Sequence, residues 1–523
     1  MRTTTRRVAT ATMAALLVAA GCSSDGSEGA ADDPAEDATT APSTTEAAAD
    51  IEWPEPTFVE GECPMPLSDA VIAEVTCGTV EVPEDRTDPD SEMISLAVAR
   101  LHSVADDPAP DPVINLQGGP GFPSLVNVEG ASRSSILDTR DYILWDQRGV
   151  GFSEPNLDCT ETNAAIWDVF GTTDDAETEG AVIEDAMRAC RDRLVDDGVA
   201  LAGYDTTQNA ADLADLRVAL GIDEWNLRAI SYGSALGIET IRNHPEGLRS
   251  VLLDSVVVPD EPFGAVARGE GALVSYQELY DACADDADCA ATYGDLEELF
   301  GEAAAALDAE PYEVTVQDPD TGEDHEVSIT GADLWAGLFN ALYDEDLIPV
   351  LPSVGQAIVD GDRAIIDAIA RDGIPFAAGQ AEGMTASVDC ADRQELLDPD
   401  AVGPFVDEHP ELGALVYLTV PETGCAEWDV PAAPAEFNEL LQGDEVDVPV
   451  IVMAGRFDPI TPVAGTQRVA DALGVELLLF PNAGHGASGS SDCARDLWFA
   501  FMDDPSTYPD TSCMDDLAPP DFA

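Results

Sequence analysis

Hydrophobic and polar positions alternate over two stretches in the first part of the chain. Residues 77–83 and 94–100 both have the period of two that is typical of antiparallel strands. Residues 112–116 and 141–146 are instead short apolar runs that end in turn residues, a pattern typical of buried strands. The sequence therefore predicts an antiparallel pair of strands followed by two buried strands.

Helical patterns separate the strands from residue 207 onward. A helical region at 207–220 precedes an apolar strand at 225–230, and a second helical stretch covers 235–242. A further strand is expected at 248–253, and it ends at Asp254. Because strands and helices alternate here, we predict an α/β fold with a mostly parallel central sheet flanked by helices.

The alternation stops between residues 259 and 446. The elements predicted in this stretch are three amphipathic helices and one short strand pair: 271–284, 296–307, 362–370, 312–316 and 326–329. Two more buried strands, 448–455 and 475–480, then resume the earlier pattern. Since the stretch lies between two strands of one sheet, we interpret it as an inserted, mainly helical cap. An independent domain with its own role is the alternative.

This organisation divides the 523 residues into five segments. A signal peptide (1–21) and a disordered tether (22–50) come first. The sheet-bearing core then comes in two parts, 51–258 and 447–523, and the cap (259–446) lies between them. About 470 residues remain after the signal and the tether, enough for one large domain with an inserted subdomain.

The first 21 residues have the features of an export signal. Arg2, Arg6 and Arg7 precede an apolar run at 13–20, which is too short to span a bilayer. The run ends in Val-Ala-Ala-Gly-Cys, which resembles a bacterial lipobox with Cys22 as the lipidated residue. We therefore expect an exported protein that a lipid on Cys22 anchors to the outer side of the cell membrane. Ordinary cleavage and secretion with an unmodified Cys22 is the alternative.

The composition of residues 23–50 favours a flexible tether. This segment has no aromatic residue and no aliphatic residue larger than alanine, so it cannot bury enough apolar surface to fold.

The charge of the whole chain excludes one class of partner. With 104 acidic residues against 22 basic ones and no lysine, the net charge is −82, and we expect no nucleic-acid partner. Such acidity suits a high-salt medium, because screening relieves self-repulsion.

The cysteine count favours disulfides. If Cys22 carries lipid, ten cysteines remain, an even set that in an exported protein reads as a disulfide framework. Ten cysteines allow ~945 pairings, so the connectivity stays open; the spacing favours five local pairs in chain order. Metal binding is disfavoured, because the chain has no Cys-x-x-Cys pair and few histidines. The ten are Cys63, Cys77, Cys159, Cys190, Cys283, Cys289, Cys390, Cys425, Cys493 and Cys513.

Ser231 is the candidate nucleophile. It lies in the turn Ala-Ile-Ser-Tyr-Gly (229–233), between the strand at 225–230 and the helical stretch at 235–242. A small-x-Ser-x-small turn of this kind is tight and strained. It exposes the serine hydroxyl at the end of a sheet and aims backbone N–H groups at a developing oxyanion. A serine that only caps the following helix is the alternative.

Asp458 and His485 are the candidates that complete a catalytic triad with Ser231. Each comes just beyond the C-terminal end of a predicted strand, where ligands bind in open parallel sheets. The histidine would take the serine proton and later give it to the leaving amine, while the aspartate orients the ring and stabilises the imidazolium. Asp254 is the one rival acid, because it follows the strand after the elbow. This chemistry needs neither a metal nor an organic cofactor.

Three motifs occur in order at suitable spacing. They are Gln-Gly-Gly-Pro-Gly (117–121), Asp-Gln-Arg-Gly-Val-Gly-Phe-Ser (146–153) and Ile-Ser-Tyr-Gly (230–233). With them, the chain from Cys63 onward resembles the proline iminopeptidase and tripeptidyl aminopeptidase group of α/β-hydrolases, most closely its large secreted actinobacterial branch. It departs from the usual motifs at two positions: Gln117 stands where histidine is usual, and alanine replaces the first elbow glycine.

The resemblance implies the α/β-hydrolase fold and an oxyanion hole made by the backbone N–H groups of Gly119 and Tyr232. The motif at 386–392 resembles the family's cysteine-and-acid motif that faces the site. Asp392 first, and Asp389 second, would therefore bind the terminal amine of a peptide through charge-assisted hydrogen bonds.

These residues and the resemblance together predict an exported serine exopeptidase. It would release short peptides or single residues from the N-terminus of peptides through an acyl-enzyme, and it would act as a monomer. Two alternatives stay open. One is an esterase or lipase with the same triad, and the other is a non-catalytic binding lipoprotein on a hydrolase scaffold.

Overall fold

In the computed structural model, the residues described are 51–72, 74–170, 176–318, 322–362, 364, 366, 380–417 and 425–522. The predicted signal peptide, tether and Cys22 lie outside these residues, as does most of the predicted helix at 362–370. Ile51–Ala523 forms one compact unit. None of the described helices has the length and apolar character needed to cross a bilayer.

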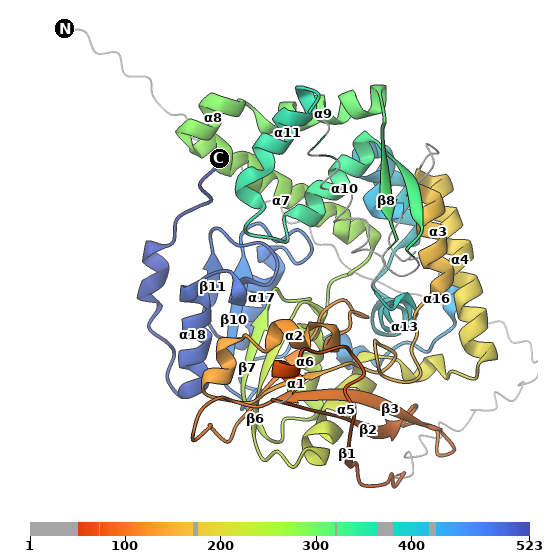
Figure 1. The fold of residues 1–523 in the computed structure, drawn as a ribbon, viewed down its shortest axis with the longest axis vertical. Helices are drawn as coiled ribbons and strands as arrows, with labels where there is room; N and C mark the ends of the chain where they lie inside the picture. The colour runs from red at the N-terminus through yellow and green to blue at the C-terminus, as the bar shows by residue number, and fades with distance from the viewer. Residues whose placement is uncertain are drawn as a thin grey trace, which may run out of the picture. The chain divides into compact units, whose positions relative to one another are not determined.

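A nine-stranded sheet forms the centre of this unit (Figure 1), in the order β1-β2-β3-β5-β4-β6-β7-β10-β11. The first three strands and β5 pair in antiparallel fashion, and the strands from β5 to β11 pair in parallel. This confirms the predicted antiparallel beginning and mostly parallel sheet. The bounds are β1 Phe58–Gly61, β2 Val75–Pro83, β3 Met93–Leu101, β4 Val113–Leu116, β5 Tyr142–Trp145, β6 Trp225–Ile230, β7 Leu248–Asp254, β10 Val450–Gly455 and β11 Leu477–Phe480.

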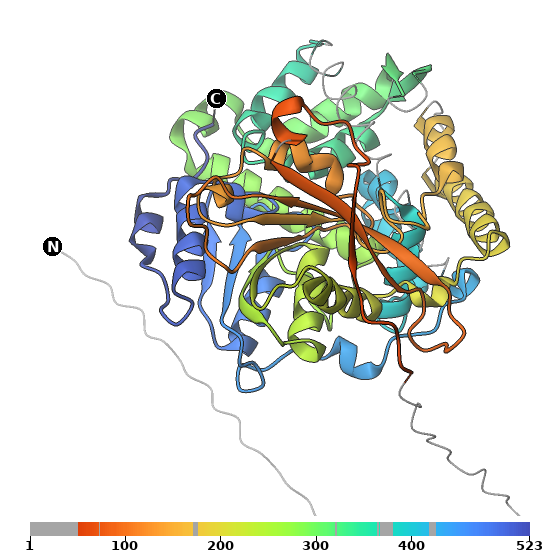
Figure 2. The same ribbon diagram turned by 60° about the horizontal axis from the view of Figure 1, so that its bottom comes forward.

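The burial of each strand follows its sequence pattern. Every residue of β4, β5 and β10 is buried, as expected for strands covered on both faces. The antiparallel strands β2 and β3, red to orange in Figure 2, lie toward one edge of the sheet. The strands that carry Ser231, Asp254 and Asp458 at their ends therefore occupy the buried parallel part of the sheet.

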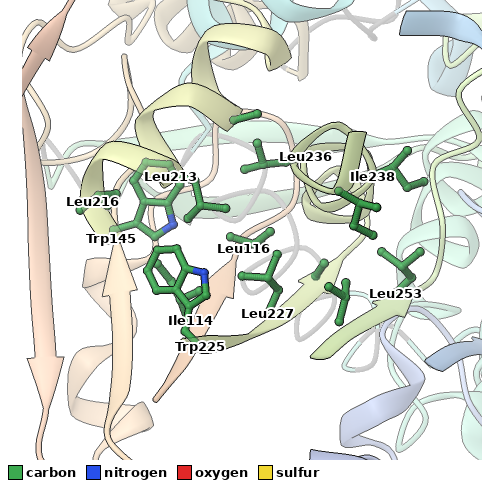
Figure 3. Close-up of a cluster of buried hydrophobic side chains, with 14 of the residues drawn as sticks. Ile114, Leu116, Trp145, Leu213, Leu216, Trp225, Leu227, Leu236, Ile238 and Leu253 are labelled. Atoms are coloured by element: carbon green, nitrogen blue, oxygen red, sulfur yellow. The ribbon is translucent and has the colours of Figure 1, made fainter. Parts of the chain in front are cut away.

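Helices cover both faces of the sheet. Helices α5 (Thr206–Ala219) and α6 (Tyr232–Asn243) join one apolar cluster with Trp145 and Trp225 (Figure 3). On the opposite face, Trp498 and Phe501 of α18 (Asp492–Asp503) pack with Met453 in a second cluster. Full burial of such side chains contributes roughly 1.5–3 kcal/mol each, so these two clusters hold the strand ends in place.

Five disulfides join the ten cysteines, and their order confirms the hypothesis of local pairs. They are Cys63–Cys77, Cys159–Cys190, Cys283–Cys289, Cys390–Cys425 and Cys493–Cys513. Disulfides persist in oxidising compartments, so this framework indicates a protein that works outside the cytoplasm.

Between β7 and β10 the chain builds a mainly helical layer, seen at the top of Figure 1. Its principal elements are α7 (Ala265–Asp285), α9 (Leu296–Ala309), the hairpin β8 (Tyr312–Gln317) and β9 (Asp324–Ile329), α10 (Gly331–Ala341), α11 (Leu351–Val359) and α13 (Glu382–Arg393). The predicted helices at 271–284 and 296–307 and the strand pair are thus present.

Two helices that the sequence pattern did not single out join this layer. Helices α3 (Thr160–Phe170) and α4 (Ala176–Asp196) precede α5 in the chain, yet they pack against β9, α13 and α15 (Gly413–Tyr417). The ring of Trp167 on α3 stacks on His325 of β9 with centroids 4.4 Å apart. The layer above the sheet is therefore built from two separate parts of the chain.

Candidate active site

The turn between β6 and α6 holds Ser231 in a strained conformation. Its φ of 59° and ψ of −129° are unusual for a residue with a side chain. The small neighbours are needed for packing. A Cβ at Gly233 would lie 2.0 Å from the carbonyl oxygen of Leu116, and one at Gly237 would lie 3.1 Å from the Cβ of Ala229. The methyl of Ala229 therefore fits only because α6 offers a glycine opposite it.

His485 and Asp458 form a hydrogen-bonded pair. The ring Nδ1 of His485 is 2.9 Å from Oδ2 of Asp458, whose side chain is fully buried. The other carboxylate oxygen accepts the backbone N–H groups of Ile460 and Thr461 at 3.0 and 2.8 Å, and the Thr461 hydroxyl donates to Oδ2 at 2.6 Å. These contacts orient the carboxylate toward the imidazole.

The pair is also tuned electrostatically. Burial works to raise the pKa of Asp458, but the His485 ring and the surrounding donors outweigh it and the pKa is lowered. Burial works to lower the pKa of His485, but the carboxylate outweighs it and the pKa is raised. The carboxylate thus stays ionised, and the ring is a stronger base than an isolated histidine.

Asp254, the rival acid, contacts the backbone beyond the histidine and not the ring. Its Oδ1 accepts the N–H of Ala487 at 3.0 Å, and its Oδ2 accepts that of Ser488 at 2.7 Å. Asp458 is therefore the acid that the fold brings to the ring of His485.

The loop at 117–125 lies against the serine turn. A Cβ on Gly118 would lie 2.8 Å from the Cβ of Ser231, so only glycine permits this close approach. Gly119 has a φ of 119°, which L side chains rarely adopt. Tyr232 is the first residue of α6, and the first N–H groups of a helix have no partner within it. The two N–H groups predicted for the oxyanion hole thus belong to segments that meet at Ser231.

The motif at 146–153 supports this loop. Asp146 accepts the N–H groups of Ser124 at 2.6 Å and Leu125 at 2.9 Å through Oδ1, and that of Phe152 at 2.9 Å through Oδ2. The side-chain amide of Gln147 donates to the carbonyl of Gln117 at 2.9 Å. The acid and the amide of this motif are therefore scaffold groups that hold the loop beside Ser231.

Helix α13 of the cap rests on the same loop. The Thr385 hydroxyl and the Gln380 amide donate to the carbonyl of Pro120 at 2.8 and 2.6 Å. The N–H of Ala381 donates to the carbonyl of Gly121 at 3.0 Å. The N-terminal end of α13 and the predicted oxyanion loop are therefore one hydrogen-bonded assembly.

The structure separates the two acids predicted to bind the substrate amine. Asp392 is fully buried; its Oδ2 accepts the Thr206 hydroxyl at 2.6 Å, and Arg393 is 4.0 Å away. Burial raises the pKa of Asp392 to about 8. Asp389 is the one residue of α13 that is not buried, and it lies one turn beyond Thr385 on the same side of the helix. The two acids therefore differ in their access to solvent.

Several residues at the site were not predicted. Thr461 fixes the Asp458 carboxylate, and Ser255 accepts the N–H of Gly486 at 2.9 Å. From the cap, the carbonyl of Tyr343 accepts the N–H of His485 at 3.1 Å, and the two rings lie 4.8 Å apart. The sequence Asp-Pro-Ile-Thr-Pro at 458–462 is a local signal for Thr461, but nothing local to Tyr343 or Ser255 indicates their contacts. Among the described residues, no cluster of His, Cys, Asp or Glu is arranged to hold a metal ion.

The chain matches two family models. Residues 111–288 match the model described as alpha/beta hydrolase fold, and residues 414–513 match the one described as TAP-like protein. The first match contains Ser231 and Asp254, and the second contains Asp458 and His485.

Relatives by sequence carry peptidase names. The chain is 26% identical over 442 residues to "Serine protease Hip1" of Mycobacterium tuberculosis, covering 80% of this chain and 83% of that protein. It is 29% identical over 224 residues to "Tripeptidyl aminopeptidase" of Streptomyces coelicolor, covering 41% of this chain and 39% of that one.

Solved structures that resemble it include a proline iminopeptidase and an esterase. A proline iminopeptidase from Mycobacterium smegmatis is 15% identical, with a TM-score of 0.35, over 82% of this chain and 98% of that one. An esterase from Exiguobacterium antarcticum is 12% identical, with a TM-score of 0.35, over 79% of this chain and 96% of that one.

Proposed function

This chain has the α/β-hydrolase fold, and from that premise we propose that it is an exported serine exopeptidase acting on the free N-terminus of peptides. The observation that carries the proposal is the hydrogen bond between His485 Nδ1 and Asp458 Oδ2, 2.9 Å apart, together with the strained turn at Ser231. The names of the sequence relatives support a peptidase.

The proposed chemistry follows the serine–histidine–aspartate pattern. Ser231 Oγ attacks the scissile carbonyl while the Nε2 of His485 takes its proton, and Asp458 stabilises the imidazolium. The histidine then gives the proton to the leaving amine, which departs and leaves an acyl-enzyme on Ser231. A water molecule, deprotonated by the same ring, hydrolyses the ester and frees the acyl product. As the acyl–Oγ bond breaks, the ring returns the proton it took from water to Ser231 Oγ, which restores the free enzyme.

The proposed oxyanion hole uses backbone donors only. The N–H groups of Gly119 and Tyr232 would bind the negative oxygen of the tetrahedral intermediate. The Tyr232 hydroxyl has another role: it is 2.7 Å from the Thr206 hydroxyl and accepts from the Asn209 amide at 3.2 Å. Tyr232→Phe therefore leaves the donor in place.

We expect Gly119→Ala to lower kcat by about 10²–10³-fold, because a Cβ at a φ of 119° forces the loop to move away from the developing oxyanion. Kinetics on a chromogenic ester would measure the loss. Gly474→Ala is the matched control, since it has a φ of 70° but its Cβ would meet nothing within 4 Å. If Gly119→Ala were as active as the control, the second oxyanion donor would have to be another N–H group of the loop.

We assign recognition of the substrate's terminal amine to α13. The structure leads us to rank Asp389 before Asp392, the reverse of the order expected from the sequence. Asp389 is our first candidate because it is the one partly exposed acid on the helix that contacts Pro120 through Thr385. Asp392 is second, since burial raises its pKa to about 8 and its carboxylate is engaged by Thr206. A carboxylate beside the oxyanion loop would pair with the ammonium of a bound peptide.

Comparing free and N-acetylated short peptides tests the exopeptidase assignment. We expect a strong preference for the free amine. Asp389→Asn should reduce that preference at least 10-fold while leaving ester hydrolysis near wild type, because one charge-assisted hydrogen bond is lost. Asp90→Asn, at an exposed acid in the turn between β2 and β3, controls for the loss of one negative charge. Equal cleavage of blocked and free peptides would remove the aminopeptidase assignment and favour the esterase alternative.

The proposal also includes the membrane anchor. The support is the lipobox-like sequence that ends at Cys22. Mass spectrometry of the N-terminal peptide of the exported protein would detect a diacylglyceryl thioether on this cysteine. An unmodified Cys22 would make the enzyme a secreted one.

A further inference from the structure

Two consecutive residues at the end of β7 hold the backbone that follows His485. The Asp254 carboxylate accepts the N–H groups of Ala487 and Ser488 at 3.0 and 2.7 Å, and the Ser255 hydroxyl accepts that of Gly486 at 2.9 Å. Three successive N–H groups after the histidine are therefore bound to one short segment. Both Asp254 and Ser255 are fully buried.

The same segment holds the serine turn. The backbone carbonyl of Asp254 accepts the N–H of Ser231 at 3.0 Å. Asp254 thus bonds to the nucleophile's backbone with its carbonyl and to the histidine loop with its carboxylate. Asp254 therefore links the two loops directly.

Ser255 has a conformation that costs energy. Among the described residues, three that are not glycine have a positive φ: Ser231, Ser255 and Asp429. Such a conformation is unfavourable and persists where the surroundings impose it, often at functional sites. Two of the three lie in the turns that meet here, and the φ of 54° at Ser255 goes with a hydroxyl bonded to Gly486.

An arginine on the neighbouring strand supplies the opposite charge. Arg228 of β6 donates to the Ser488 hydroxyl at 3.4 Å and to the side-chain oxygen of Asn115 at 3.0 Å. Burial raises the pKa of Asp254, while the Ser488 contacts and Arg228 work against this shift. The donors that the carboxylate holds are thus also the groups that favour its ionised form.

We propose that Asp254 and Ser255 are positioning residues that hold the imidazole of His485 within reach of Ser231. This rests on the proposed function of Ser231 and His485. Proton transfer between the two side chains depends steeply on their separation, and a displacement of about 1 Å can cost 10²-fold in rate. Gly486, directly after His485, has a left-handed φ of 86°, and its N–H is one of the three groups that these two residues bind.

Two variants and a matched control test the proposal. Ser255→Ala removes the hydroxyl and keeps the Cβ, and Asp254→Asn replaces an acceptor for one N–H by an amide donor. We expect kcat on a chromogenic ester to fall about 10-fold for Ser255→Ala and about 10- to 100-fold for Asp254→Asn, with KM unchanged. Ser250→Ala removes an equally buried hydroxyl at the other end of β7, where it bonds to Asn226, and should stay near wild type.

The pH profile separates positioning from a merely structural role. A displaced ring keeps its partner Asp458, so the acid limb of kcat/KM in Ser255→Ala should keep the wild-type inflection while the plateau falls. In Asp254→Asn the inflection should move slightly to lower pH, because the Asp254 charge raises the pKa of His485 less than Asp458 does. The rate of covalent labelling of Ser231 by a fluorophosphonate should fall by the same factor as kcat. Folded variants labelled at the wild-type rate would overturn the proposal. Wild-type protein that is not labelled at Ser231 would instead refute the proposed function.

Discussion

Replacing Ser231 by alanine is expected to abolish amide and ester hydrolysis, with a loss of about 10⁶-fold in kcat, while the fold is retained. The reason is that alanine lacks the hydroxyl on which the acyl-enzyme forms. Alanine also has a Cβ, as the serine does at its φ of 59°, so the substitution requires no change in the backbone conformation. Peptide turnover and fluorophosphonate labelling, measured beside a thermal melt, check both halves of this expectation.

The melt decides how a loss of activity is interpreted. Ser231→Ala should melt near the wild-type temperature, because the residue is small and its neighbours Ala229 and Gly233 are unchanged. Residual amide hydrolysis by the folded variant well above the uncatalysed rate would mean that another residue is the nucleophile. In that case the binding-lipoprotein alternative would still fail, since the protein would be an enzyme.

Replacing Asp458 by asparagine is expected to lower kcat by about 10⁴-fold, because the imidazole loses the acceptor that orients it and stabilises its charged form. The pH profile gives a second signature. The histidine must be neutral to act as base, so activity falls as the pH drops through its pKa, which Asp458 raises above the ordinary value of about 6.5. Without the carboxylate, the pKa of His485 falls and the acid limb moves to lower pH.

The comparison with Asp254 makes this expectation specific. Asp254→Asn should be the milder change, and the inflection assigned to His485 should stay near its wild-type pH. The contrast follows from their contacts, since Asp458 bonds to the ring and Asp254 bonds to backbone N–H groups. The reverse ranking, with a shifted inflection in Asp254→Asn, would show that the ring changes partner in solution.

The cap and the oxyanion loop are linked in a way that bears on specificity. Thr385 of α13 and the two residues just before the helix, Gln380 and Ala381, donate hydrogen bonds to the carbonyls of Pro120 and Gly121, and α13 carries Asp389 on the same side as Thr385. A substrate amine bound at Asp389 would therefore be held by the helix that also supports the loop of the oxyanion hole. Removing the free amine from a peptide should then lower kcat as well as raise KM.

Periodicity and local turn chemistry determined much of this protein from the sequence. Alternation at 77–83 and 94–100 marked the antiparallel strands, and short apolar runs marked the buried parallel ones. The tight turn at Ser231 was visible because its neighbours are small, and the cysteine spacing indicated the local disulfides that the structure contains. The strands, the serine turn and the local disulfides all depend on residues that are close together in the chain. A single sequence is therefore enough to indicate them.

The tertiary structure alone decided which side chains meet. Asp254 and Asp458 both follow buried strands, and β7 and β10 are neighbours in the sheet, so sequence order left both acids near His485. The loop after β10 carries Asp458 to the ring, whereas Asp254 faces the backbone beyond it. The burial of Asp392 against Thr206 was equally hidden, because these residues lie 186 positions apart. Contacts of this kind depend on strand order and helix packing, which no local pattern of residues encodes.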